Sequence, residues 1–145
     1  MIESTFKSKY FSLCTTILLV TISLSIPTFG QKMTPELIVQ ANFDAYNQRD
    51  ITKFMLYIDK DIKMYNFSDN TLILEGWEAC KTTYSDLFDQ SPNLHSTIIK
   101  RIVIGNQVID HEHIRGRKEA SGITELVLIY EIRNQLIKKI TVLRK

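Results

Sequence analysis

The sequence predicts an α+β domain of the order helix, helix, two strands, helix, four strands. Two observations support this fold class. Apolar residues recur at helical spacing in the segment that follows residue 34, and alternating strand-like runs fill the last third of the chain. Helices first and antiparallel strands last are typical of a domain in which the helices pack on one face of a curved sheet.

Three helices are expected from their start signals. Thr34-Pro35-Glu36 supplies an N-cap, a proline at the first helical position and an acid in the first turn, so the first helix should run to about residue 48. Asp50 can cap a short second helix over residues 51–58. Helical spacing returns over residues 76–90 and predicts the third helix.

Six strands are expected from period-two alternation and from the turn residues between the runs. A first hairpin is predicted over residues 62–67 and 72–75, and four further strands over residues 94–104, 108–115, 123–132 and 136–143. With 145 residues in all, the chain has room for one domain of this kind.

The first 30 residues have the pattern of a signal peptide. Lys7 and Lys9 precede an almost uncharged apolar run over residues 11–26, and Thr28 and Gly30 occupy the −3 and −1 positions of a peptidase site. We therefore expect cleavage before Gln31, a folded domain over residues 31–145, and a periplasmic or secreted protein without membrane contact. The alternative is an uncleaved N-terminal anchor.

The charge balance argues against a nucleic-acid partner. The chain holds 18 Lys and Arg against 16 Asp and Glu, a formal net charge of +2. Proteins that bind phosphate backbones concentrate positive charge far more strongly.

Several short motifs, in this order, resemble the nuclear transport factor 2-like superfamily, specifically an exported bacterial member of its SnoaL-like and ketosteroid-isomerase-like branch. They are AYNQRD at 45–50, GWEA at 76–79, GN at 105–106 and YEI at 130–132. The resemblance implies a cone-shaped domain whose bent antiparallel sheet wraps around the long N-terminal helix and encloses a pocket. It also implies a homodimer formed through the outer surface of the sheet, but no particular function, because this fold hosts many.

The steroid isomerase mechanism that the resemblance brings with it does not fit this sequence. The family's carboxylate base falls at Asn66, its tyrosine at Asn42 and its protonated aspartate near Leu128. An amide cannot take a proton at neutral pH, and a leucine cannot donate a hydrogen bond. That mechanism is therefore absent unless other residues replace these three.

Two carboxylates on one predicted strand could carry other chemistry. Alternation along residues 108–115 places Asp110 and Glu112 on one face, which the family register turns into the cone. Such a pair could supply a general acid and a general base, with His95 as a proton shuttle. The alternative is an open rim where both acids are solvated or paired with Lys100 or Arg101.

The same alternation puts His111 and His113 on the opposite, outer face. His-x-His on a strand can bind a metal when a neighbour adds a third ligand. The sequence identifies no such ligand, so we expect no metal, and the resemblance implies no cofactor.

These observations favour a binding domain for a small apolar or amphipathic molecule. The expected pocket residues are Asn42, Tyr46, Asn66, Trp77 and Tyr130. The alternative is a cofactor-independent lyase, isomerase or hydrolase that uses Asp110 or Glu112 as its base.

The sequence also predicts a homodimer. Val127, Ile129, Ile137 and Leu143 would otherwise form an exposed apolar patch on the outer face of the sheet.

Overall fold

The computed structural model describes residues 32–118 and 120–144, and its elements follow the predicted order. The helices are α1 (Pro35–Gln48), α2 (Ile51–Met55) and α3 (Trp77–Gln90), and the strands are β1 (Ile58–Asn66), β2 (Leu72–Glu75), β3 (His95–Ile104), β4 (Gln107–Arg115), β5 (Thr124–Arg133) and β6 (Leu136–Arg144). The predicted leader and its cleavage site before Gln31 lie outside the described residues. Among the described helices, none has the length and apolar character of a membrane span.

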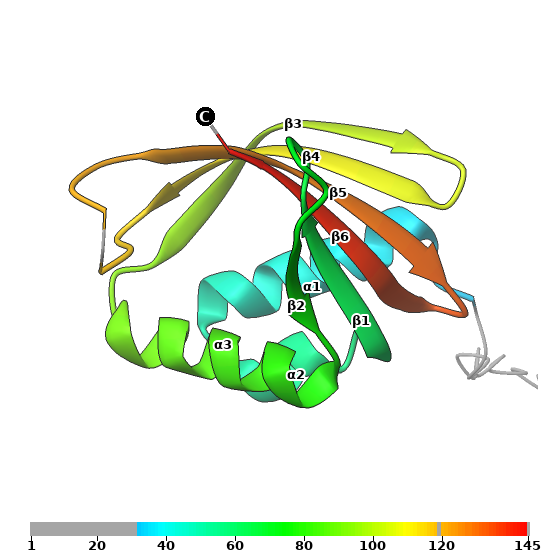
Figure 1. Ribbon diagram of the computed structural model, residues 1–145, viewed down its shortest axis with the longest axis horizontal. Coiled ribbons are helices and arrows are strands. Elements are labelled where there is room, and N and C mark those ends of the chain that lie inside the picture. The colour runs from blue at the N-terminus through cyan, green and yellow to red at the C-terminus, as the bar shows by residue number, and fades with distance from the viewer. Residues whose placement is uncertain (1–31, 119, 145) are drawn as a thin grey trace, which may run out of the picture. The chain divides into compact units, whose positions relative to one another are not determined.

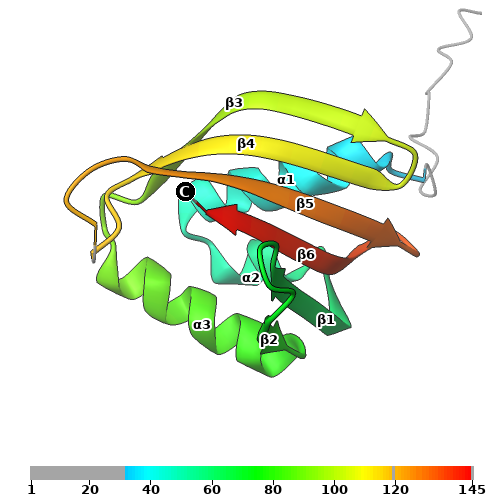
Figure 2. The same cartoon turned by 45° about the horizontal axis from the view of Figure 1, so that its top comes forward.

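The six strands form one sheet in the order β2-β1-β6-β5-β4-β3. Figures 1 and 2 show this sheet arching over α1, α2 and α3, which all lie on its concave side. The predicted α+β class with a curved sheet is confirmed. One pair departs from the antiparallel expectation, because β1 runs parallel to β6.

The ends of α1 and α2 follow from their caps. The Thr34 side chain accepts a hydrogen bond from the Leu37 amide at 3.3 Å, and α1 ends at Arg49, whose φ of 54° is left-handed. Asp50 accepts from the Lys53 amide at 3.0 Å and starts α2. The predicted extent of α2 to residue 58 is wrong, because Ile58 is already the first residue of β1.

An irregularity in the last hairpin changes one residue of the predicted dimer face. The β5–β6 register shifts near the start of β6, so that Ile137 shares the inner face with Ile140 and is fully buried. The assignment of Ile137 to the outer patch is therefore wrong. Val127 and Ile129 are half-buried, and Leu143 is 39% exposed, so these three residues remain for an outer apolar surface.

Candidate ligand-binding cavity

A cavity of about 450 Å³ lies between the concave side of the sheet and the helices. Its wall includes an aromatic cluster made by Tyr46, Phe54 and Tyr84, and Tyr130 of β5 also lines it. The rings of Phe54 and Tyr84 are 4.4 Å apart, and the Tyr46 ring lies 6.3 Å from that of Tyr84 in an edge-on arrangement. An aromatic wall that also carries tyrosine hydroxyl groups suits a small molecule of mixed polarity.

Strand β4 turns both of its acids inward. Val108, Asp110, Glu112 and Ile114 are each 3% exposed or less, and alternation leaves His111 and His113 on the other face. Asp110 and Glu112 therefore face inward, as expected. Their surroundings differ sharply, and this difference decides what each can do.

Asp110 is held in a buried ion pair. The Arg101 guanidinium, directly across on β3, donates from Nε to Oδ1 at 2.7 Å and from Nη2 to Oδ2 at 2.6 Å. Its Nη1 donates to Gln40 of α1 at 2.7 Å. Asp110 does not line the cavity. The structure therefore shows the alternative in which Asp110 pairs with Arg101. This ion pair argues against a role for Asp110 as a catalytic base.

Glu112 lines the cavity and is only half satisfied. Its Oε2 accepts a hydrogen bond from Ser96 Oγ at 2.6 Å, but its buried Oε1 has no hydrogen-bond partner among the described residues. Ser96 is fixed in turn by Asn47, whose amide side chain accepts from the Ser96 N–H at 2.7 Å and donates to its carbonyl at 3.0 Å. Helix α1 therefore positions the strand that orients Glu112.

Burial raises the pKa of Glu112 from 4.5 to about 7. Desolvation of the carboxylate is the main cause, and the nearby charge of Asp110 raises the pKa further. The Ser96 hydrogen bond and the charge of Arg101 oppose this rise, as does the Tyr130 hydroxyl, which lies near the carboxylate without meeting hydrogen-bond geometry. The group is consequently poised between its acid and its carboxylate form near neutral pH.

We expect Glu112→Gln to stabilise the protein at about pH 8 but not at about pH 4. A pKa that is higher in the folded state means that stability is full below the unfolded value of 4.5 and falls as the pH rises to about 7. The full shift corresponds to a loss of about 3 kcal/mol in the wild type above that pH. Urea unfolding of the variant and the wild type at each pH measures the difference in their free energies of unfolding. A chelator keeps metal ions from affecting the comparison.

The stabilisation by Glu112→Gln should grow from pH 4.5 to about pH 7 and stay constant above that pH. The same measurement on Glu75→Gln is the matched control, since Glu75 is an exposed residue of β2 paired with Lys63 at 2.8 Å. If the Glu112→Gln difference did not vary with pH, the carboxyl would not be desolvated as described.

Basic residues outnumber acidic residues in the cavity lining. Arg117, Lys118 and Arg144 contribute three positive groups to the lining, against two acids, Asp86 and Glu112. The Arg117 guanidinium lies close enough to lower the pKa of Tyr46, although burial raises that pKa overall. The Lys118 Nζ donates to Gln90 at 3.3 Å, whereas no described residue pairs with the Arg117 guanidinium.

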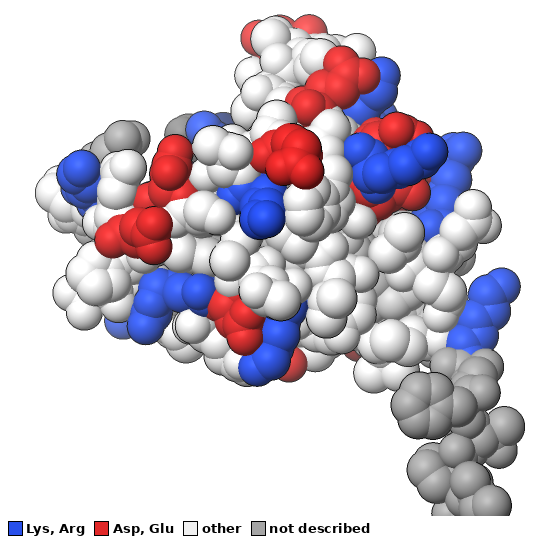
Figure 3. Space-filling model, turned by 90° about the horizontal axis from the view of Figure 1, so that it is seen from below, with Lys and Arg blue, Asp and Glu red and all other residues white. Residues whose placement is uncertain are grey.

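The helical side of the surface has no such bias. Figure 3 views this side from below, and its acidic and basic side chains are interspersed without a broad area of one sign. This face offers no continuous basic surface to a polyanion.

Three of the five residues expected in the pocket are found there. Asn42, Tyr46 and Tyr130 line the cavity, and the Asn42 amide donates to the Phe54 carbonyl at 2.9 Å. Leu128, at the position of the family's aspartate, also lines the cavity.

Asn66, Trp77 and His95 lie elsewhere. Asn66 ends β1 at a turn and donates to Ser68 at 3.0 Å, and Trp77 packs partly buried against the core beneath the Lys81 ammonium. His95 is exposed, because alternation on β3 turns the next residue inward instead. The expectations that Asn66 and Trp77 line the pocket and that His95 acts as its proton shuttle are therefore corrected.

The sequence did not identify Ser96, Tyr84 or Arg117 as residues of the site. Alternation along β3 places Ser96 on the face opposite His95, but the sequence alone did not show which of the two faces is buried. Tyr84 was visible as an apolar position of α3, whereas Arg117 follows β4 in a loop and carried no periodic signal.

Residues 39–140 match the SnoaL-like domain family, which is more than half of the chain. The protein belongs to the SnoaL-like domain family. No protein of curated function matches the sequence. The match to the SnoaL-like family confirms the predicted nuclear transport factor 2-like superfamily.

Solved structures similar to this SnoaL-like protein share its fold. They include a cystatin-fold protein from Novosphingobium aromaticivorans, with a TM-score of 0.69, 20% identity, and coverage of 77% of this chain and 99% of the other. A nuclear transport factor 2-like protein from Cytophaga hutchinsonii has a TM-score of 0.65, 13% identity, and coverage of 78% and 91%. A protein of ketosteroid-isomerase-like fold from Catenulispora acidiphila, in complex with trimethylamine, has a TM-score of 0.61, 19% identity, and coverage of 76% and 85%.

Proposed function

We propose that the protein binds a small amphipathic molecule in its cavity and that Glu112 Oε1 recognises a hydrogen-bond donor on that molecule. The unpartnered Oε1 is the observation that carries the proposal. A buried acceptor left without a partner costs about 1–3 kcal/mol, and a ligand N–H or O–H would recover this cost. Ser96 and Asn47 already fix the carboxylate, so the ligand meets a preorganised acceptor.

The positive groups of the lining favour an acidic group at the other end of the ligand. Arg117 is half-buried and presents a guanidinium to the cavity, and Lys118 and Arg144 add to its charge. The ligand class that suits both ends is a hydroxy or amino acid with an aromatic or aliphatic body. Trimethylamine, which the Catenulispora protein holds, has no acidic group for Arg117.

A matched pair of fluorescent ligands tests this proposal. 6-Hydroxy-2-naphthoate carries a hydroxyl and a carboxylate on opposite ends of an apolar body, and 2-naphthoate lacks only the hydroxyl. At about pH 8, where Glu112 is a carboxylate, we expect the hydroxyl to improve wild-type affinity about tenfold or more, the value of one hydrogen bond to a charged group. In Glu112→Met, which removes the acceptor, the two ligands should bind equally.

Arg117→Met is the matched control for the other end. It should weaken both ligands to the same degree and leave the hydroxyl preference intact, because both carry the carboxylate. A hydroxyl preference that persisted in Glu112→Met would refute the role of Glu112.

A second candidate is proton transfer by the same carboxylate, without a cofactor. The unpartnered Oε1 that could accept a ligand donor could also take a proton from an acidic C–H bond, as an isomerase or lyase requires. The direct assay is deuterium exchange at the α-carbon of β-tetralone in heavy water, followed by nuclear magnetic resonance. Wild-type acceleration that Glu112→Gln abolishes would favour an enzyme, whereas binding without exchange would favour a carrier.

We also propose an exported homodimer. The leader pattern of residues 1–30 supports export, and the outer-face residues Val127, Ile129 and Leu143 support an interface on the convex side of the sheet.

A further inference from the structure

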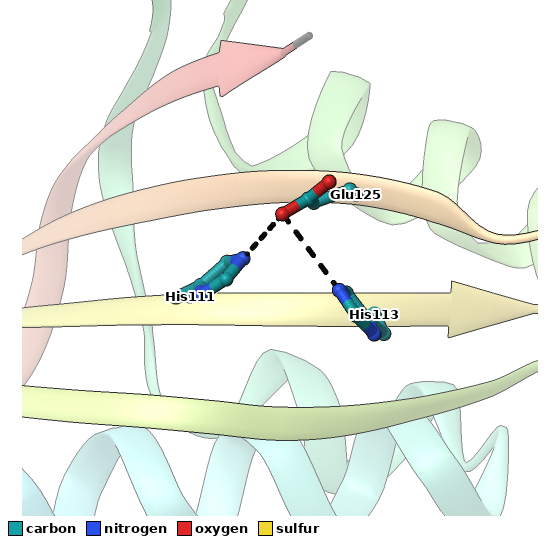
Figure 4. A group of neighbouring side chains, drawn as sticks. All are labelled: His111, His113 and Glu125. Atoms are coloured by element: carbon teal, nitrogen blue, oxygen red, sulfur yellow. Dashed lines mark hydrogen bonds and ion pairs between the residues drawn. The ribbon is translucent and has the colours of Figure 1, made fainter.

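The outer face of the sheet brings together three side chains with metal-binding chemistry, on the opposite side from the cavity. They are His111 and His113 of β4 and Glu125 of β5 (Figure 4). His113 pairs directly with Glu125 across the two strands, and His111 lies two residues away on the same face. The third ligand that the sequence could not identify is therefore supplied by the neighbouring strand.

The three donors converge on one point. Nε2 of His111 lies 2.9 Å from Glu125 Oε1, and Nε2 of His113 lies 3.8 Å from the same oxygen. All three ligand atoms lie within 4.8 Å of one another. Bonds of about 2.0–2.1 Å to a tetrahedral zinc ion place its ligand atoms roughly 3.3 Å apart, so the two measured distances bracket the required value.

We propose that His111, His113 and Glu125 form a binding site for one Zn²⁺ ion. The two histidine rings stand at 90° to each other with centroids 5.5 Å apart, an arrangement in which both Nε2 atoms reach a shared ion. Each side chain is about one-third to two-fifths exposed in the single chain, which leaves the fourth position open to water or to a ligand from a second copy on this face.

The strands hold two of the ligands at a fixed separation. Residues i and i+2 of a strand project from the same face, so the His-x-His pair needs no loop to bring it together. One carboxylate and two imidazoles form a donor set that zinc accepts, and the carboxylate partly neutralises the ion. This site is independent of the cavity, because Glu112 projects from β4 to the opposite face.

Zinc binding to untagged, metal-free protein tests the site by competition with a chromophoric chelator. We expect one Zn²⁺ per chain, with affinity reduced roughly tenfold or more by His111→Ala, by His113→Ala and by Glu125→Gln. His95→Ala is the matched control, because His95 is an exposed histidine of the same sheet that lies outside the group. It should leave the affinity unchanged.

Cobalt gives an independent signature that needs no variant. Co²⁺ bound to the wild type should show the intense visible absorption of a four-coordinate ion, and one equivalent of Zn²⁺ should remove it. Unfolding midpoints of the metal-free variants verify that each is folded. Absence of zinc binding to the wild type, or zinc affinity unchanged in either histidine variant, would overturn the proposal.

Discussion

Arg101→Met should cost about 3–5 kcal/mol of stability, because it leaves the Asp110 carboxylate buried without a partner. The Asp110 side chain is fully buried, and both of its oxygens accept hydrogen bonds from Arg101 at 2.6–2.7 Å. The same guanidinium donates to Gln40, so its loss also removes one of the hydrogen bonds between α1 and β3. Urea unfolding at neutral pH measures the change in the free energy of unfolding.

Two controls separate the effect of burying the charges from the effect of the ion pair itself. Lys63→Met breaks an ion pair of 2.8 Å whose partners are about half exposed, and should cost less than about 1 kcal/mol. The double variant Arg101→Met/Asp110→Leu removes both buried charges and should recover most of the stability lost in the single variant. A double variant as unstable as Arg101→Met alone would mean that Arg101 contributes by packing instead.

Gly116→Ala should destabilise the protein by about 3 kcal/mol or more, through a clash with backbone that cannot move aside. Gly116 has a φ of +73°, and a Cβ atom there would lie 2.0 Å from the carbonyl oxygen of Asn93. This close approach packs the end of β4 against the chain that enters β3. Arg117 follows at once, so the same contact sets where the positive lining of the cavity begins.

Gly105→Ala is the matched comparison for Gly116→Ala. Gly105 also has a positive φ, +58°, but a Cβ atom there would meet nothing within 4 Å. Only the backbone conformation is then penalised, at about 1 kcal/mol. Thermal or urea unfolding of the two variants should differ clearly, and equal losses would show that the Asn93 contact does not constrain Gly116.

The fold could be predicted from the sequence because local signals and global topology agree. Pro35 and Asp50 specify helix starts, and alternation along β4 specifies which face of the sheet is buried. The departures come from how the strands pair, which the alternation of residues along a single strand does not show. The parallel contact of β1 with β6 and the register shift that buries Ile137 have no local signal.

The candidate site could be predicted only in part, for the same reason. Alternation showed that Asp110 and Glu112 face inward, but not that Arg101 neutralises one and Ser96 half-satisfies the other. Those partners come from β3, whose register against β4 decides which carboxylate is free. Glu125 was likewise an unremarked strand residue until the β4–β5 pairing placed it beside His113.

A crystal structure of the protein bound to the hydroxynaphthoate tests the central proposal most directly. We expect the naphthalene ring among Tyr46, Tyr84 and Tyr130, with its hydroxyl about 2.6 Å from Glu112 Oε1 and its carboxylate toward Arg117. A ligand seated outside the cavity, or inside it with the hydroxyl turned away from Glu112, would contradict the proposed recognition.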